Sequence, residues 1–144
     1  MSLARTWSVA LTGVEGHVVD VEAHIGNGLP GFSLVGLPDA ALAEARSRVR
    51  AAVANSEQDW PQRKLTVALS PATLPKAGAH FDMAIALAVL GAAEVVPRTA
   101  LDGVVFLGEL GLDGRVKPVR GTLPSVIRRG LDVLIVRSQG DARS

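Results

Sequence analysis

The sequence predicts a mixed α+β domain in which helices pack against one β-sheet. Residues 17–25 and 64–69 alternate apolar and polar side chains, which is typical of strands with one buried face. Residues 38–55 carry an apolar stripe at helical spacing, and residues 81–92 are apolar on nearly every face. The elements follow one another as β-β-α-β-α-β-β-α-β, an order that indicates a mixed sheet.

The first half of the chain is predicted to form a hairpin followed by a helix. The side chains expected to face the core from residues 17–25 are Val19, Val21, Ala23 and Ile25. The glycine-rich residues 26–31 are interpreted as a hairpin turn that leads into a strand at 32–35. Pro38 and Asp39 then suit the first turn of a helix, because a fixed φ and a carboxylate are both favourable there.

The second half is predicted to add four strands, a central helix and a short helix. We expect strands at 64–69, 104–110, 115–119 and 131–136, and helices at 81–92 and 122–129. Asp113 and Gly114 supply a tight turn between the middle two of these strands. One domain over residues 1–138 holds all these elements, and residues 139–144 are interpreted as a tail or the start of a linker.

Composition excludes several classes of protein. The chain has no cysteine, which excludes disulfides, cysteine-zinc sites and thiol catalysis. Its N-terminus has no apolar signal-peptide core. The longest apolar run, residues 83–93, is too short to span a bilayer. We therefore expect a cytoplasmic protein without a membrane partner.

Charge is distributed unevenly along the chain. Residues 1–45 hold one base and five acids, whereas residues 46–144 hold fourteen bases and nine acids. Residues 115–129 contain five bases and no acid. Such a segment is either a surface that faces an anion or simply a solvated face.

Two short motifs are weak signals for a cofactor or a metal. Gly26, Gly28 and Gly31 match a dinucleotide-binding pattern, but a strand rather than a helix is expected to follow them. His17 and His24 lie on opposite faces of one predicted strand, which disfavours a shared zinc ion. No Gly-Lys pair is present to form a phosphate-binding P-loop. We expect no cofactor and no metal in this segment.

Three side chains, those of His80, Asp82 and Ser70, could carry chemistry. His80 and Asp82 could form an acid–base pair, although a carboxylate at a helix N-terminus also has a purely structural role. Ser70 follows a predicted strand, but no feature of the sequence supplies the base that a nucleophilic serine needs. The structural interpretation is favoured for His80 and Asp82, and no peptidase activity is expected from Ser70.

Arginines on the first predicted helix are also ambiguous. Arg46, Arg48 and Arg50 are expected to point largely away from its apolar stripe. They could contact phosphates or keep the helix soluble, and no aromatic residue lies among them to stack on bases.

Several segments together resemble one known family. They are residues 36–41 (GLPDAA), 44–50 (EARSRVR), 74–82 (LPKAGAHFD), 106–114 (FLGELGLDG) and 116–121 (VKPVRG). In order and spacing they are similar to the N-terminal domain of the magnesium-chelatase-like AAA+ ATPases, the family of the competence protein ComM. The resemblance runs from about Trp7 to Val136.

This resemblance implies a fold, a parent protein and a lost activity. The fold would be the Lon-protease-like version of the ribosomal protein S5 domain 2 fold. The parent would be a bacterial, cytoplasmic AAA+ ATPase that uses ATP and Mg²⁺ in a further module, forms a homo-hexameric ring and drives branch migration of DNA. His80 takes the place of the catalytic serine of Lon-type peptidases, and Leu123 lies where such a peptidase supplies its lysine. A non-catalytic domain is therefore expected.

Three functions remain open at this point. The first is an accessory domain of a DNA-processing motor that assembles the ring or guides single-stranded or branched DNA. Its candidate phosphate contacts are Lys76, Arg115, Lys117 and Arg120. The second is a protein-interaction module that docks on its own ATPase module or on neighbouring subunits without contacting DNA. The third is a residual serine peptidase, the least favoured of the three.

Overall fold

The computed structural model describes residues 2–12, 15–72, 74, 76, 79–117 and 132–135. The strands in these residues are β1 (Ser2–Thr12), β2 (Glu15–Gly26), β3 (Gly31–Val35), β4 (Lys64–Ser70), β5 (Val104–Leu107), β6 (Glu109–Leu110), β7 (Val116–Lys117) and β8 (Asp132–Ile135). The helices are α1 (Asp39–Asn55), α2 (Asp82–Ala92) and a 3-10 turn at Arg98–Ala100.

Six strands form one mixed sheet in the order β3-β4-β2-β1-β5-β8. Antiparallel pairs join β1 to β2 and β2 to β4, and parallel pairs join β3 to β4, β1 to β5 and β5 to β8. A separate antiparallel ribbon consists of β6 and β7. The predicted α+β class with a mixed sheet is confirmed.

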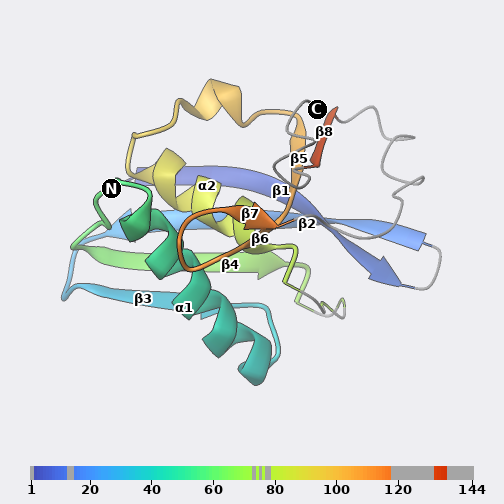
Figure 1. The fold of residues 1–144 in the computed structure, drawn as a ribbon, viewed down its shortest axis with the longest axis horizontal. Helices are drawn as coiled ribbons and strands as arrows, with labels where there is room; N and C mark the ends of the chain where they lie inside the picture. Colours follow the sequence, from blue (N-terminus) through green and yellow to red (C-terminus); the bar gives the residue numbers. More distant parts are fainter. Residues whose placement is uncertain are drawn as a thin grey trace.

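Both helices lie on the same face of the sheet (Figure 1). α2 is central, as its apolar sequence predicts, and it packs on β1, β2 and β5 while also contacting α1. The alternation of β2 is confirmed too, because Val19, Val21, Ala23 and Ile25 are all buried beneath the helices. The core is thus an aliphatic layer between one sheet face and two helices.

The predicted hairpin between residues 17–25 and 32–35 is wrong. β4 lies between these strands. Leu69 of β4 is opposite Val21 of β2, and Val67 of β4 is opposite Leu34 of β3. α1 is instead the crossover between the parallel strands β3 and β4, as expected for a βαβ unit. Alternation indicates which side chains are buried, but it does not indicate which strand lies alongside.

β1 was not predicted, and it provides the hairpin partner of β2 that the sequence analysis assigned to β3. The two strands pair along their whole length, from Ser2 opposite Ile25 to Thr12 opposite Glu15. The small side chains of Thr6 and Ser8 occupy its buried face, so β1 lacks the apolar alternation that marks β2.

The strand predicted at residues 104–110 is divided at Gly108 into β5 and β6. A Cβ atom at this position would lie 2.7 Å from Cγ1 of Val116, so only glycine fits where the chain leaves the sheet. The turn at 113–114 and the last strand are confirmed by β7 and β8. The helix predicted at 122–129 lies outside the described residues. Across the described part of the chain, no helix has the length and apolar character needed to cross a membrane.

Candidate functional site

The start of α2 is the polar centre of an otherwise aliphatic core. The Met83 amide donates to the Gly108 carbonyl at 3.0 Å, and the Gly108 amide donates to the His80 carbonyl at 3.0 Å. These two bonds attach the β5–β6 junction to the first turn of α2. They also satisfy an amide that has no partner within the helix itself.

Asp82 is held by groups from two other elements. Its side chain is 1% exposed. Nε of Arg48 donates to one carboxylate oxygen at 2.6 Å, and Nη2 of Arg48 donates to the other at 3.1 Å. The Leu110 amide also donates to the carboxylate at 3.1 Å. A two-pronged arginine–carboxylate pair is geometrically specific, so Asp82 fixes the positions of α1, α2 and β6 relative to one another.

Burial raises the pKa of Asp82, while the hydrogen bonds from Arg48 and from the Leu110 amide oppose that rise. The hydrogen bond to Asp82 in turn raises the pKa of Arg48. Three N–H groups point at the two carboxylate oxygens, and this donor set fits an ionised carboxylate. The expectation that Arg48 points away from the core is therefore wrong.

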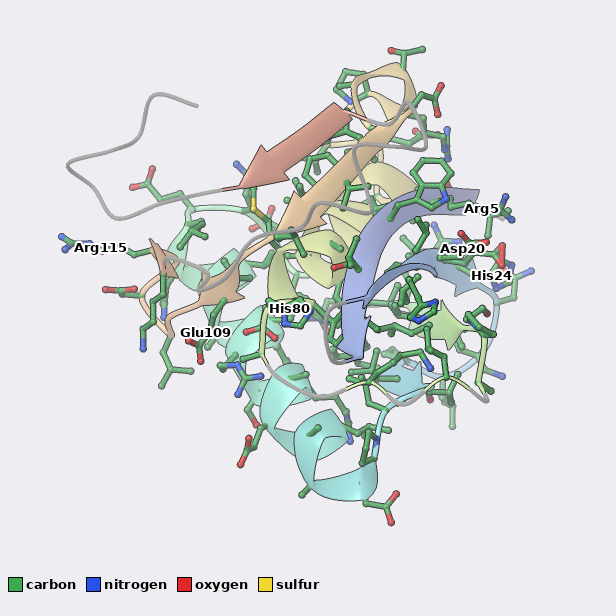
Figure 2. All side chains as sticks on the ribbon, turned by 90° about the vertical axis from the view of Figure 1, so that its right-hand side faces the viewer. Arg5, Asp20, His24, His80, Glu109 and Arg115 are labelled. Atoms are coloured by element: carbon green, nitrogen blue, oxygen red, sulfur yellow. The ribbon has the colours of Figure 1, made fainter. Side chains whose placement is uncertain are left out.

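His80 is also engaged in a structural contact. Its Nε2 lies 2.7 Å from the Val9 carbonyl of β1, to which it donates, and its ring lies 4.2 Å from the Phe81 ring. Burial lowers the pKa of His80, against the raising effects of the Val9 carbonyl and of the Asp82 carboxylate. In Figure 2 the His80 side chain lies close to β1. His80 thus attaches the start of α2 to the sheet.

The geometry favours the structural alternative for His80 and Asp82. Both carboxylate oxygens of Asp82 accept hydrogen bonds from Arg48, and Nε2 of His80 donates a hydrogen bond to the Val9 carbonyl. The carboxylate does not cap its own helix, which the sequence analysis offered as its structural role. It acts between elements, and the sequence alone had no signal for this because Arg48 is 34 residues away.

The hydroxyl groups that bear on the question of a nucleophile are those of Ser70, Thr6 and Ser8, all on the six-stranded sheet. Ser70 is exposed at the end of β4. The Thr6 hydroxyl is fully buried and donates to the Ala84 carbonyl at 2.7 Å, which attaches β1 to α2. Ser8 is also fully buried, and its hydroxyl has no hydrogen-bond partner in the described part of the chain. Thr6 and Ser8 were not predicted to lie at this site because their strand, β1, was not predicted from the sequence.

Lys76, one of the candidate phosphate contacts, is not exposed to solvent. It is buried, with 3% of its surface exposed, and its Nζ donates to the carbonyls of Pro71 at 2.6 Å and Leu74 at 3.0 Å. Burial lowers the pKa of the Lys76 amine. Its ammonium therefore serves its own loop in this structure and does not face an external phosphate.

The other proposed phosphate contacts lie on or beyond the β6–β7 hairpin. The Arg115 side chain is 70% exposed and points away from the body of the domain (Figure 2). Its Nε lies 3.8 Å from a carboxylate oxygen of Asp113. Lys117 is exposed as well. Arg120 and the peptidase-like position Leu123 lie outside the described residues.

Arg46 and Arg50 are exposed on α1, as expected. The Arg46 guanidinium lies 5.9 Å from the centre of the Phe32 ring, and that ring lies 5.0 Å from the ring of Trp60. Arg46 thus lies over Phe32, one ring of an aromatic pair at the sheet edge.

Two cavities open elsewhere on the domain, and neither is lined by His80 or Asp82. One, of about 150 Å³, has mainly apolar walls and lies between α1, α2 and the β6–β7 hairpin. The other, of about 520 Å³, lies at the opposite end of α2 beside Trp60 and has both apolar and charged walls. Among the described residues, no group of three or more histidine, aspartate or glutamate side chains is arranged to hold a metal ion.

The fold and this site define an α+β domain in which the polar residues at the start of α2 hold helices and strands together. The family model described as subunit ChlI of Mg-chelatase matches residues 21–135. The chain belongs to this family.

Named relatives agree with this assignment. The competence protein ComM of Haemophilus influenzae is 42% identical over 127 residues, which is 88% of this chain and 25% of that protein. An uncharacterized protein of Mycobacterium tuberculosis is 58% identical over the same shares of both chains. The uncharacterized protein YifB of Escherichia coli is 40% identical over 144 residues, or 28% of its length. The chain therefore spans about a quarter of the length of the curated relatives it matches.

Proposed function

We propose that this chain is the non-catalytic N-terminal accessory domain of a ComM-like AAA+ ATPase and that it serves assembly of the ATPase ring. The parent would be a homo-hexameric DNA helicase of the bacterial cytoplasm that acts in DNA uptake and recombination. ATP and Mg²⁺ would bind in its AAA+ module. Family membership and the ComM relative support this proposal. We also propose that the mixed sheet with two helices on one face is a variant of the Lon-like S5 domain 2 fold.

One observation carries the non-catalytic part of the proposal. The three titratable groups of the peptidase-like segment are all engaged in structural contacts: Asp82 with Arg48, His80 with the Val9 carbonyl, and Lys76 with carbonyls of its own loop. A serine nucleophile needs a base with a free nitrogen or oxygen aimed at its hydroxyl. The segment uses His80 and Asp82 to fix α2 in place, which suits a domain that presents surfaces to partners.

Ring assembly is tested on the full-length protein by deleting residues 1–138. We expect the deletion variant to sediment mainly as smaller species under conditions in which the intact protein forms rings with nucleotide. Sedimentation velocity over a range of concentrations measures this directly. Rings that form with equal affinity without the domain would overturn the assembly role.

Guidance of DNA is the second candidate, because Arg115 and Lys117 both lie exposed on one hairpin. Phosphate contacts release counterions, so the logarithm of the binding constant would fall linearly with the logarithm of the salt concentration. Fluorescence anisotropy with single-stranded and forked DNA across a salt series measures this slope for residues 1–144. We expect the double substitution Arg115→Glu and Lys117→Glu to weaken binding and flatten the slope.

A matched control separates a specific hairpin contact from general attraction. The substitutions Arg46→Glu and Arg50→Glu change the net charge by the same amount on exposed positions of α1. If both double variants lose affinity equally, the hairpin is not a DNA contact. If residues 1–144 do not bind DNA at low salt, DNA contact by this domain is excluded and ring assembly remains.

A further inference from the structure

An apolar cleft lies where α1, α2 and the β6–β7 hairpin meet. Its walls include Val53, Met83, Leu87, Leu90, Leu110 and Val116. The cleft has a volume of about 150 Å³ and is partly open to solvent. An apolar cavity of roughly this size accommodates a single ring or branched aliphatic group. Its dimensions therefore suit one large apolar side chain rather than an extended ligand.

A side chain of this kind projects from another part of the same molecule. Leu29 is 88% exposed, on the loop between β2 and β3, and its neighbours Asn27, Gly28 and Pro30 are exposed as well. Pro30 restricts the backbone that follows Leu29, so the leucine loses less freedom on docking than it would on a fully flexible loop.

The charges beside the leucine and beside the cleft are complementary. The Lys64 side chain lies along the Leu29 loop, near enough that a Cβ atom on Gly28 would be 3.1 Å from its Cδ. At the cleft, Glu57 lies between two wall residues and has no ion-pair partner within the described ranges. Asp113 and Arg115, beside the wall residue Gly114, are 3.8 Å apart and offset each other. The other exposed or half-buried charges next to wall residues are Asp59, Glu109 and Lys117, so acids outnumber bases around the cleft.

We propose that Leu29 of one copy of this chain docks into the apolar cleft of a second copy, with Lys64 of the first facing Glu57 of the second. In each contact one copy contributes its leucine and the other contributes its cleft. Every copy therefore keeps one of its two surfaces free for a further neighbour. Such head-to-tail contacts either close into a ring or continue as an open filament. This contact rests on the proposed ring-assembly function and names the surfaces that would carry it.

The absence of cysteine from the chain allows a direct test by cross-linking. One variant carries Asn27→Cys beside Leu29, and the other carries Gln58→Cys at the rim of the cleft. Both positions are exposed, and neither substitution alters the leucine. The two variants are mixed, oxidised mildly and separated on a non-reducing gel. We expect mixed disulfide dimers to form at least about tenfold faster than with Leu3→Cys, an exposed position outside the contact, in place of Asn27→Cys.

Two further substitutions test the leucine and the charges separately. Leu29→Asp in the Asn27→Cys variant should reduce the cross-linking rate to that of the Leu3→Cys control, and circular dichroism should show an unchanged fold because Leu29 is exposed. Lys64→Glu in the same variant should slow cross-linking several-fold, and Glu57→Lys in the Gln58→Cys partner should restore it. Cross-linking that is indifferent to Leu29→Asp would overturn the proposal.

The outcomes separate this contact from ring assembly as such. If full-length rings require residues 1–138 but tolerate Leu29→Asp, the contact is wrong and the assembly role stands. If the rings form without residues 1–138, the assembly role fails on its own test. If both Leu29→Asp and the deletion prevent rings, and the charge exchange restores cross-linking, both proposals are supported.

Discussion

Arg48 of α1 holds the buried carboxylate of Asp82 at the start of α2 through hydrogen bonds of 2.6 and 3.1 Å. The Leu110 amide of β6 donates to the same carboxylate. Three elements that are far apart in the sequence therefore meet at one ionised group. The segment that resembles the catalytic serine region of a peptidase here contributes to the framework of the fold.

Removal of Arg48 should destabilise the domain strongly. Arg48→Met leaves the Asp82 carboxylate buried without its counter-ion, and such a loss costs about 3 kcal/mol or more of unfolding free energy. Urea denaturation followed by circular dichroism measures the change. Arg50→Met, on the exposed face of the same helix, should change stability by less than about 0.5 kcal/mol. Equal effects of the two substitutions would contradict the role of the ion pair.

His80 should make stability depend on pH. Burial lowers the pKa of His80 below the ordinary value of 6.5, so the unfolded chain binds more protons than the folded one as pH falls through about 6.5. Stability from this group is therefore complete at neutral pH and declines toward acid. His80→Gln keeps an N–H donor for the Val9 carbonyl but does not titrate.

The pH effect is read from the difference between the wild type and His80→Gln in urea midpoints at pH 5.5 and pH 8. We expect the wild type to lose more stability than the variant at the lower pH. The two proteins differ only at position 80, so the comparison isolates the contribution of His80. Parallel pH profiles would show that His80 does not titrate differently in the folded state.

Gly36 should tolerate alanine far less well than Gly103. Both have positive φ, +100° and +71°, but a Cβ atom at Gly36 would lie 2.3 Å from the Leu69 carbonyl oxygen. At Gly103 a Cβ atom would meet no atom within 4 Å. We expect about 1 kcal/mol of destabilisation for Gly103→Ala from backbone strain alone. Gly36→Ala should cost clearly more in the same denaturation assay, and a smaller cost would refute the close approach of β4.

Glu94 offers a stabilising substitution. It follows α2 with a φ of 65°, a left-handed conformation that glycine adopts without steric cost. Glu94→Gly should raise the free energy of unfolding by about 1 kcal/mol, and thermal denaturation should show a higher melting temperature. Ala43→Gly, on the exposed face of α1, should lower stability by about the same amount. A loss of stability in both variants would indicate that the Glu94 side chain makes a contact that compensates its backbone strain.

Local patterns in the sequence determined the elements whose side chains repeat at a regular period. The alternation from Val19 to Ile25 predicted the buried face of β2, and the all-apolar run after Asp82 predicted a central helix. These predictions hold because burial of a side chain on a strand or a helix follows directly from its period. β1 escaped detection because the side chains on its buried face, Thr6 and Ser8, are polar.

Tertiary structure alone decided which strands pair and which polar groups meet. The chain runs directly from β2 to β3, yet β4 lies between them in the sheet. The parallel partner of β3 is β4, which follows β3 only after the helical crossover α1. Lys76 and Arg48 look like surface bases in the sequence, yet one binds loop carbonyls and the other binds Asp82. Partners for buried charges come from elements distant in sequence, so local pattern determines the elements, and only packing determines what their charged groups contact.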